Sequence, residues 1–177
     1  MTVEVEHEFE AWRATARRLL AASVEPADVT WVSVDQGQPM LPLDDPPAEL
    51  PDAPARNRVP ARFVAAARSV VLHRDDAKWP LLYRLLWRLR EERRLLDVAA
   101  DPDVARVAAM VKSVRRDEHK MHAFVRFREM ADPFGARFVA WFEPAHRIVA
   151  LAAPFFARRF AGMRWSILTP EDRKSVV

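Results

Sequence analysis

Cysteine is absent from this 177-residue chain, and glycine and tyrosine are scarce. The lack of cysteine excludes disulfide frameworks, thiolate zinc sites and cysteine nucleophiles. With three glycines, the sequence offers no glycine-rich phosphate-binding loop and no dinucleotide-binding fingerprint. No apolar run approaches the ~20 residues that a membrane-spanning helix needs. The acidic N-terminus lacks the basic-then-apolar order of a signal peptide. We therefore expect a cytoplasmic protein without a membrane segment.

The remaining composition is typical of a folded globular protein. Half of the residues are hydrophobic and 30% are charged. A chain of this length buries roughly two-thirds of its unfolded surface, so a single domain over residues 1–177 is predicted. Seven of the fourteen prolines fall between residues 39 and 60, and proline disfavours regular hydrogen-bonded structure. This predicts a Pro-rich connector at about 35–59, and residues 171–177 are expected to form a non-native or truncated tail.

Charge is divided unevenly along the chain, although the net charge is +3. Residues 1–57 hold four Lys and Arg against eleven Asp and Glu, whereas residues 58–177 hold twenty-four against fourteen. Cations that meet phosphates release counterions, so a basic region is typical of nucleic-acid binding. A solvated surface and a GC-rich genome also produce arginine-rich sequences. The charge pattern therefore permits a DNA partner without requiring one.

Apolar residues recur at helical spacing in several segments and alternate in others. Helices are predicted at 9–20, 60–74, 78–94, 101–120 and 144–162. Strands are predicted at 30–34, 122–130, 136–143 and 163–168. The expected fold class is α+β, with helices packed around a small, mostly antiparallel sheet that includes a β-hairpin near 122–142.

The stretch "VRRDEHKMHAFVRFREM", residues 114–130, suggests a binding surface. On a helical wheel, the cations that precede residue 121 share one arc beside the apolar face. On the strand predicted to follow, even-numbered side chains share one face, because side chains alternate along a strand. Cations would contact phosphates, and an aromatic ring could stack on an unpaired base. The candidate nucleic-acid-binding residues are Lys112, Arg115, Arg116, His119, Lys120, His122, Phe124, Arg126 and Arg128.

Other interpretations of these residues remain open. Arg126 and Arg128 could pair with Glu143 or with helix carboxylates, while residues 154–160 could cover Phe124. His119 and His122 could act as acid and base in an enzyme of unrecognised chemistry. A metal site is disfavoured, because the two histidines are predicted on different elements and no third ligand is apparent. No catalytic residue, metal or cofactor is predicted.

Long parts of the sequence resemble a known bacterial family. The runs are "FEAWRATARRLLAASVEPADVTWV", "LHRDDAKWPLLYRLLWRLREERRLLDVAADPDV", "VRRDEHKMHAFVRFREM" and "FVAWFEPAHRIVALAAPFFARRFAGMRWSILTP". They resemble a domain family of unknown function whose members are labelled "probable DNA metabolism protein". The family occurs alone, alongside a radical-SAM protein, or fused ahead of a uracil-DNA glycosylase domain of the UdgX type. The last residues, "EDRKSVV", do not resemble the family.

The resemblance implies a DNA-repair setting and carries over no catalytic residues. We expect an accessory DNA-metabolism domain that binds DNA or docks a uracil-DNA glycosylase or radical-SAM partner. It is not expected to be catalytic by itself, and this chain contains no glycosylase machinery. The alternative is a protein-interaction module without affinity for DNA.

Overall fold

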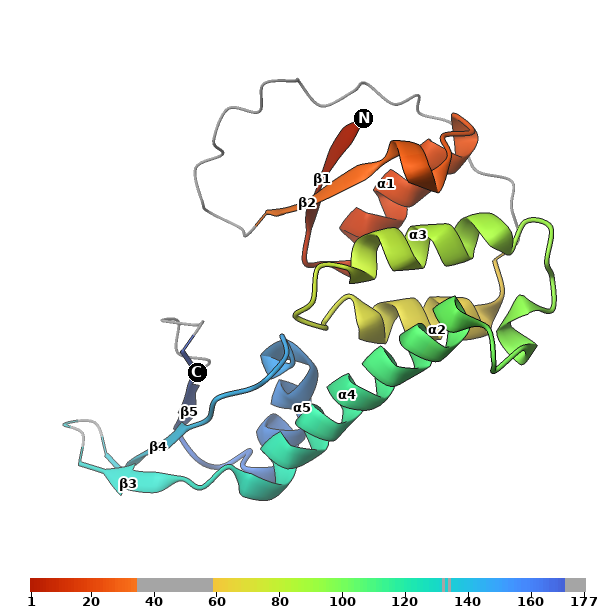
Figure 1. Ribbon diagram of the computed structural model, residues 1–177. Coiled ribbons are helices and arrows are strands. Elements are labelled where there is room, and N and C mark those ends of the chain that lie inside the picture. Colours follow the sequence, from red (N-terminus) through yellow and green to blue (C-terminus); the bar gives the residue numbers. More distant parts are fainter. Residues whose placement is uncertain (35–58, 132, 134, 171–177) are drawn as a thin grey trace. The chain divides into compact units, whose positions relative to one another are not determined.

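The chain forms two compact units in a computed structural model, Met1–Lys112 and Ser113–Val177 (Figure 1). Each unit combines helices with its own small sheet, which confirms the α+β class at that level. The structure describes residues 1–34, 59–131, 133 and 135–170. All of the predicted connector except Val59, and the whole predicted tail, lie outside these residues. The expectation of a single domain stays a prediction.

The N-terminal unit opens with a strand–helix–strand arrangement. Strand β1 (Thr2–Glu6) is followed by α1 (Phe9–Ala21), a 3-10 turn at Pro26–Asp28 and β2 (Thr30–Val34). The two strands pair in parallel, as is usual where a helix forms the connection. Strand β1 was missed by the sequence analysis, although the alternation in "TVEVE", with Val3 and Val5 buried, could have revealed it.

Three further helices complete this unit. They are α2 (Ala61–Val70), α3 (Lys78–Arg88) and the first part of α4 (Pro102–Phe124), with a 3-10 turn at Leu95–Asp97 before α4. Figure 1 shows α3 lying between α1 and α2. The apolar residues at helical spacing form buried faces, and α1 is an example. Its buried residues are Phe9, Trp12, Ala16, Leu19 and Leu20.

Lys78, the first residue of α3, is a buried cation that the sequence analysis did not identify. Its side chain is fully buried. The ammonium group donates to the carbonyl oxygen of His73 at 2.6 Å and lies 3.0 Å from His7 Nδ1. It also lies 3.5 Å from Asp76 Oδ1. Buried charges persist where hydrogen-bond partners surround them, so Lys78 joins the loop before α3 to the end of β1.

The C-terminal unit continues α4 and adds a three-stranded sheet. Its other elements are β3 (Arg128–Met130), β4 (Arg137–Trp141), α5 (Val149–Arg159) and β5 (Trp165–Leu168). The strand order is β3-β4-β5, with β3 and β4 antiparallel and β4 and β5 parallel. The predicted hairpin is therefore confirmed, although its first strand is shorter than expected.

The expectation of a mostly antiparallel sheet is wrong. Within the described part of the chain, two of the three strand pairings are parallel, and the strands form two sheets. The reason is connectivity, because α1 and α5 each return the chain to the start of a neighbouring strand. A search of the described helices found none with the length and apolar character to cross a membrane.

Aromatic rings form much of the core of the C-terminal unit. Phe156 on α5 is 2% exposed and makes ring contacts with Phe127, Phe160 and Trp165. The helix α5 continues through Pro154. The aromatic cluster anchors α5 beside the sheet, so the end of α4 and the hairpin share a stable support.

Candidate nucleic-acid interface

Helix α4 carries the predicted basic residues, and its start is defined by its own sequence. The Asp101 carboxylate accepts hydrogen bonds from the backbone amides of Asp103 at 3.0 Å and Val104 at 3.1 Å. This is the geometry of an N-cap, and Pro102 occupies the first helical position, where proline is tolerated. The predicted beginning of the helix is confirmed. Its end differs from the prediction.

The helix extends to Phe124, so His122 and Phe124 lie on α4 and not on a strand. The helical hydrogen bonding even continues one residue further, because the Val125 amide donates to Met121 O at 3.2 Å. Met121 and Val125 are both buried and lie four residues apart. This spacing places them on one face of a helix, and it would also place them on one face of a strand. The prediction of a strand is therefore wrong for residues 122–124, which lie on α4, and Ala123 is exposed.

One face of α4 in the C-terminal unit is cationic. Arg115, Arg116, His119 and Lys120 are all exposed, while Val114 and Met121 on the opposite side are buried. At 100° per residue, these four side chains fall within one broad arc of the helix. Lys112, also exposed, lies on the same helix within one turn of Arg115 and Arg116. We call Arg115, Arg116, His119 and Lys120, which all lie in the C-terminal unit, the α4 ridge.

The side chains of the α4 ridge have no hydrogen-bond or ion-pair partner among the residues that the structure describes. The neighbouring carboxylate of Asp117 is turned to the other side of the helix and is buried. The positive charge of this face is consequently not neutralised by nearby described acids.

The arginines of the N-terminal unit provide a contrast. Arg84 makes a two-point contact with Asp103, at 3.0 Å from Nε to Oδ2 and 2.6 Å from the terminal nitrogen to Oδ1. The hydrogen bonds and charge of Arg84, followed by those of Arg88, lower the pKa of the Asp103 carboxyl. Arg62 and Arg106 likewise pair with aspartates. These paired arginines serve the fold of the N-terminal unit, whereas the cations of the α4 ridge have no acidic partner among the described residues.

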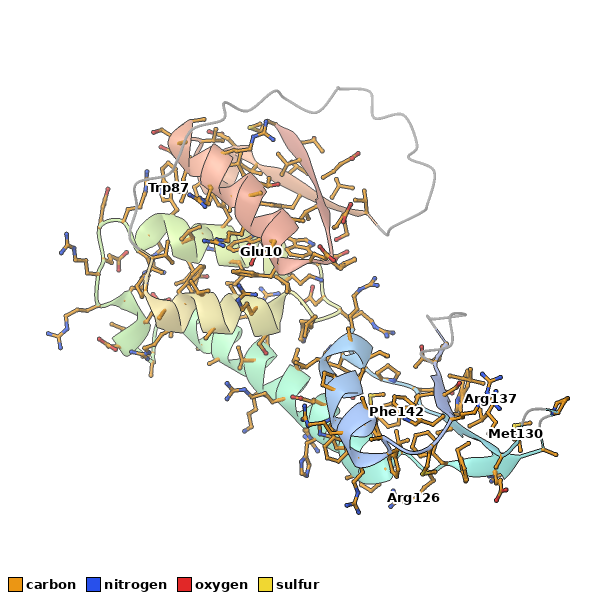
Figure 2. All side chains as sticks on the ribbon, turned by 180° about the vertical axis from the view of Figure 1, so that it is seen from behind. Glu10, Trp87, Arg126, Met130, Arg137 and Phe142 are labelled. Atoms are coloured by element: carbon orange, nitrogen blue, oxygen red, sulfur yellow. The ribbon has the colours of Figure 1, made fainter. Side chains whose placement is uncertain are left out.

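Phe124 and Arg126 lie at the C-terminal end of α4. The Phe124 ring is 65% exposed and follows Lys120 by four residues on the helix. Arg126, labelled in Figure 2, donates to the carbonyl oxygens of Ala123 at 2.7 Å and Val125 at 3.0 Å. These bonds hold the guanidinium at the helix end, where a cation is favoured by the backbone dipole, and the side chain remains exposed.

The interpretation that the hairpin and α5 neutralise or cover these residues is wrong. Glu143 accepts a hydrogen bond from Trp141 Nε1 at 3.0 Å. Arg128, exposed on β3, has no ion-pair partner among residues with a described position. Phe124 is largely in solvent and is therefore not covered by residues 154–160.

His122 is separated from the other candidates by its environment. Its ring stacks on Phe155 of α5, with centroids 4.1 Å apart and planes inclined at 27°. Its Nε2 atom is buried without a hydrogen-bond partner. On the helical wheel, His122 falls at the edge of the ridge that borders α5. The structure therefore leaves eight of the nine candidates exposed and packs His122 against an aromatic ring.

The acid–base role considered for His119 and His122 gains no partner from the described residues. Both lie on α4, contrary to the prediction of different elements. His119 is exposed, and neither imidazole has a carboxylate within hydrogen-bond reach in the described part of the chain. Nor do the described residues gather three His, Cys, Asp or Glu side chains in a group that could hold a metal ion.

A buried polar set behind the ridge was missed by the sequence analysis. The Asp117 carboxylate accepts the backbone N–H of His146 at 2.9 Å, and Ser113 Oγ lies 2.8 Å from His146 Nε2. Asp117 bonds the backbone of His146 in this contact, whereas a catalytic triad requires the carboxylate to orient the imidazole. The three residues attach the loop before α5 to α4. They hold the helix that presents the ridge.

Comparisons with known proteins identify a family and no relative of known function. A family model described as a domain of unknown function, DUF4130, matches residues 76–177. The match covers more than half of the chain and contains all nine candidate residues. Neither the curated proteins nor the solved structures yielded a match.

Proposed function

Because this chain belongs to the DUF4130 family, whose description assigns no function, we propose from the site itself that it binds nucleic acid through the α4 ridge. Phosphates are the proposed ligands of the ridge, and Arg126 and Arg128 extend the contact toward the hairpin. The supporting observation is the lack of described acidic partners for exposed cations that share one helix face. Unpaired surface cations attract phosphates and gain from the release of counterions.

DNA is the proposed nucleic acid, and the role is accessory and non-catalytic. This part of the proposal rests on the resemblance to domains labelled as DNA metabolism proteins. A uracil-DNA glycosylase or a radical-SAM protein is the proposed partner in repair. Such a complex is tested by size-exclusion chromatography of the purified proteins with and without DNA.

Fluorescence anisotropy with labelled single-stranded and duplex DNA tests the binding directly. Binding is expected at ~50 mM salt and should weaken steeply as salt is added. If about five phosphates of duplex DNA are contacted, the slope of log K against log salt is about −4.5. A lack of measurable binding to either DNA at ~50 mM salt would refute the proposal.

A matched pair of variants separates a local site from a general charge effect. Arg115→Glu with Arg116→Glu reverses two ridge cations, and Arg158→Glu with Arg159→Glu makes the same charge change at the end of α5, where both arginines are exposed. Loss of at least tenfold in affinity is expected for the first variant and a smaller loss for the second. Equal losses in two variants that retain wild-type circular dichroism would contradict a site on the α4 ridge.

An acidic protein is the alternative ligand for the same ridge. In that case the wild-type chain has no affinity for DNA, and the Arg115 and Arg116 reversal disrupts a protein complex. The same two variants therefore distinguish the two functions.

A further inference from the structure

The N-terminal unit contains a pocket that none of the preceding functions uses. It has a volume of about 230 Å³ and is formed by the buried face of α1, by the start of α2 and by Leu86 of α3. Its walls are largely apolar and include the rings of Phe9, Trp12 and Phe63. Sites for drug-sized ligands have volumes of about 300–1,000 Å³, so this pocket suits a smaller molecule.

The ring of Trp12 forms part of the pocket wall. The indole N–H of Trp12 is buried and has no hydrogen-bond acceptor in the structure. A buried donor without an acceptor is unfavourable, because it has lost water without replacement. Other atoms of the Trp12 ring line the pocket, so the indole signal of Trp12 reports on what the pocket holds.

Positive charge borders the same pocket. Arg13 and Arg17 contribute to its lining and are both exposed. They are four residues apart, so they lie one above the other on α1. Arg13 pairs with Glu10 at 3.0 Å, and Glu10 also accepts from Arg68 at 2.9 Å. Arg17 has no partner among the described residues, which leaves its charge available to an anion.

We propose that this pocket binds a small aromatic carboxylate. The ring would lie among Phe9, Trp12 and Phe63, where burial of apolar surface provides the attraction. The carboxylate would face the guanidinium group of Arg17. This combination of an aromatic enclosure and a cation without a described partner matches an amphipathic anion better than a neutral hydrocarbon.

Phenylacetate is the probe for the test, and phenylacetamide is its neutral counterpart. The full chain is labelled with ¹⁵N, and the six tryptophan indole N–H signals are followed by NMR. The Trp12 signal is assigned by its disappearance in Trp12→Phe. A saturating shift of the Trp12 signal is expected with phenylacetate, with a dissociation constant on the order of 1 mM. Binding of phenylacetamide should be at least threefold weaker.

Variants at the rim test the charge contact without disturbing the core. Arg17→Gln should weaken the binding of phenylacetate at least threefold and leave the affinity for phenylacetamide unchanged. Arg93→Gln removes an equally exposed cation that does not line the pocket, and it should change neither affinity. The proposal is overturned if phenylacetate does not shift the Trp12 signal. It is also overturned if acid and amide bind equally, or if Arg17→Gln has no effect. If the protein's own side chains fill the pocket, phenylacetate would not shift the Trp12 signal.

Discussion

Tyr83 provides a direct test of the N-terminal core, because it is the single tyrosine of the chain. The residue is fully buried on α3, and its hydroxyl donates to the carbonyl oxygen of Val24 at 2.7 Å. Burial raises the pKa of the Tyr83 phenol to about 12 from an ordinary value near 10, while the charge of Arg90 acts in the opposite direction. The phenol should therefore ionise well after an exposed tyrosine would.

The shifted pKa has a consequence for stability at high pH. As pH rises, the unfolded chain loses its phenolic proton at about pH 10, whereas the folded chain retains it until about pH 12. The contribution of the protonated Tyr83 phenol to the free energy of unfolding is fully present below about pH 10 and is lost as pH rises through about pH 12. One pKa unit corresponds to about 1.4 kcal/mol, so the full loss of stability is about 3 kcal/mol, and about half of it is reached near pH 11.

Near-ultraviolet absorbance of tyrosinate measures the ionisation, and circular dichroism shows over which pH range the chain stays folded. Denaturant unfolding at several alkaline pH values measures the stability. Tyr83→Phe is the matched control, since it removes the ionisation and should flatten the alkaline decline at a cost of about 1 kcal/mol near neutral pH. A folded chain whose tyrosine ionises near pH 10 would refute the reasoning, as would an unchanged alkaline decline in the phenylalanine variant.

Three further predictions concern buried charges. Hydrogen bonds with Arg84 are the chief cause of the lowered pKa of the Asp103 carboxyl. The contribution of this carboxylate to the free energy of unfolding is present above about pH 4 and is lost as pH falls through the folded pKa. Acid unfolding of Asp103→Asn should therefore be less pH-dependent than that of the wild type. Asp117→Ala removes the acceptor of the buried His146 amide, so it should lower the free energy of unfolding by about 1–3 kcal/mol and speed hydrogen exchange at that amide. Asp117→Asn keeps an oxygen and should lower the stability less. Equal exchange rates in the wild type and Asp117→Ala would contradict this contact. Lys78→Met keeps the size of a fully buried side chain but removes its hydrogen bonds. Urea unfolding should show that the free energy of unfolding falls by about 1.5–3 kcal/mol. An unchanged urea midpoint would show that the ammonium group is dispensable for stability.

The candidate site shows how far local sequence patterns can reach. The face of α4 that carries Arg115, Arg116 and His119 follows from helical spacing, which depends on residues a few positions apart. The end of that helix was misjudged, because Met121 and Val125 fit both a helix and an alternating strand. The distinction depends on packing with α5, which places Phe155 against His122. No pattern within residues 114–130 contains that information.

The sequence by itself determined the helix faces, the cationic character of the C-terminal two-thirds and the exclusion of cysteine chemistry, because these follow from residue types and short-range periodicity. Tertiary structure alone decided that β1 and β2 pair in parallel, that Lys78 is buried and that Asp117 bonds the distant His146. It also decided which cations find acidic partners. Such partners are chosen among residues far apart in the chain, so spacing along the sequence does not reveal that Arg84 is paired and that Arg116 has no partner among the described residues.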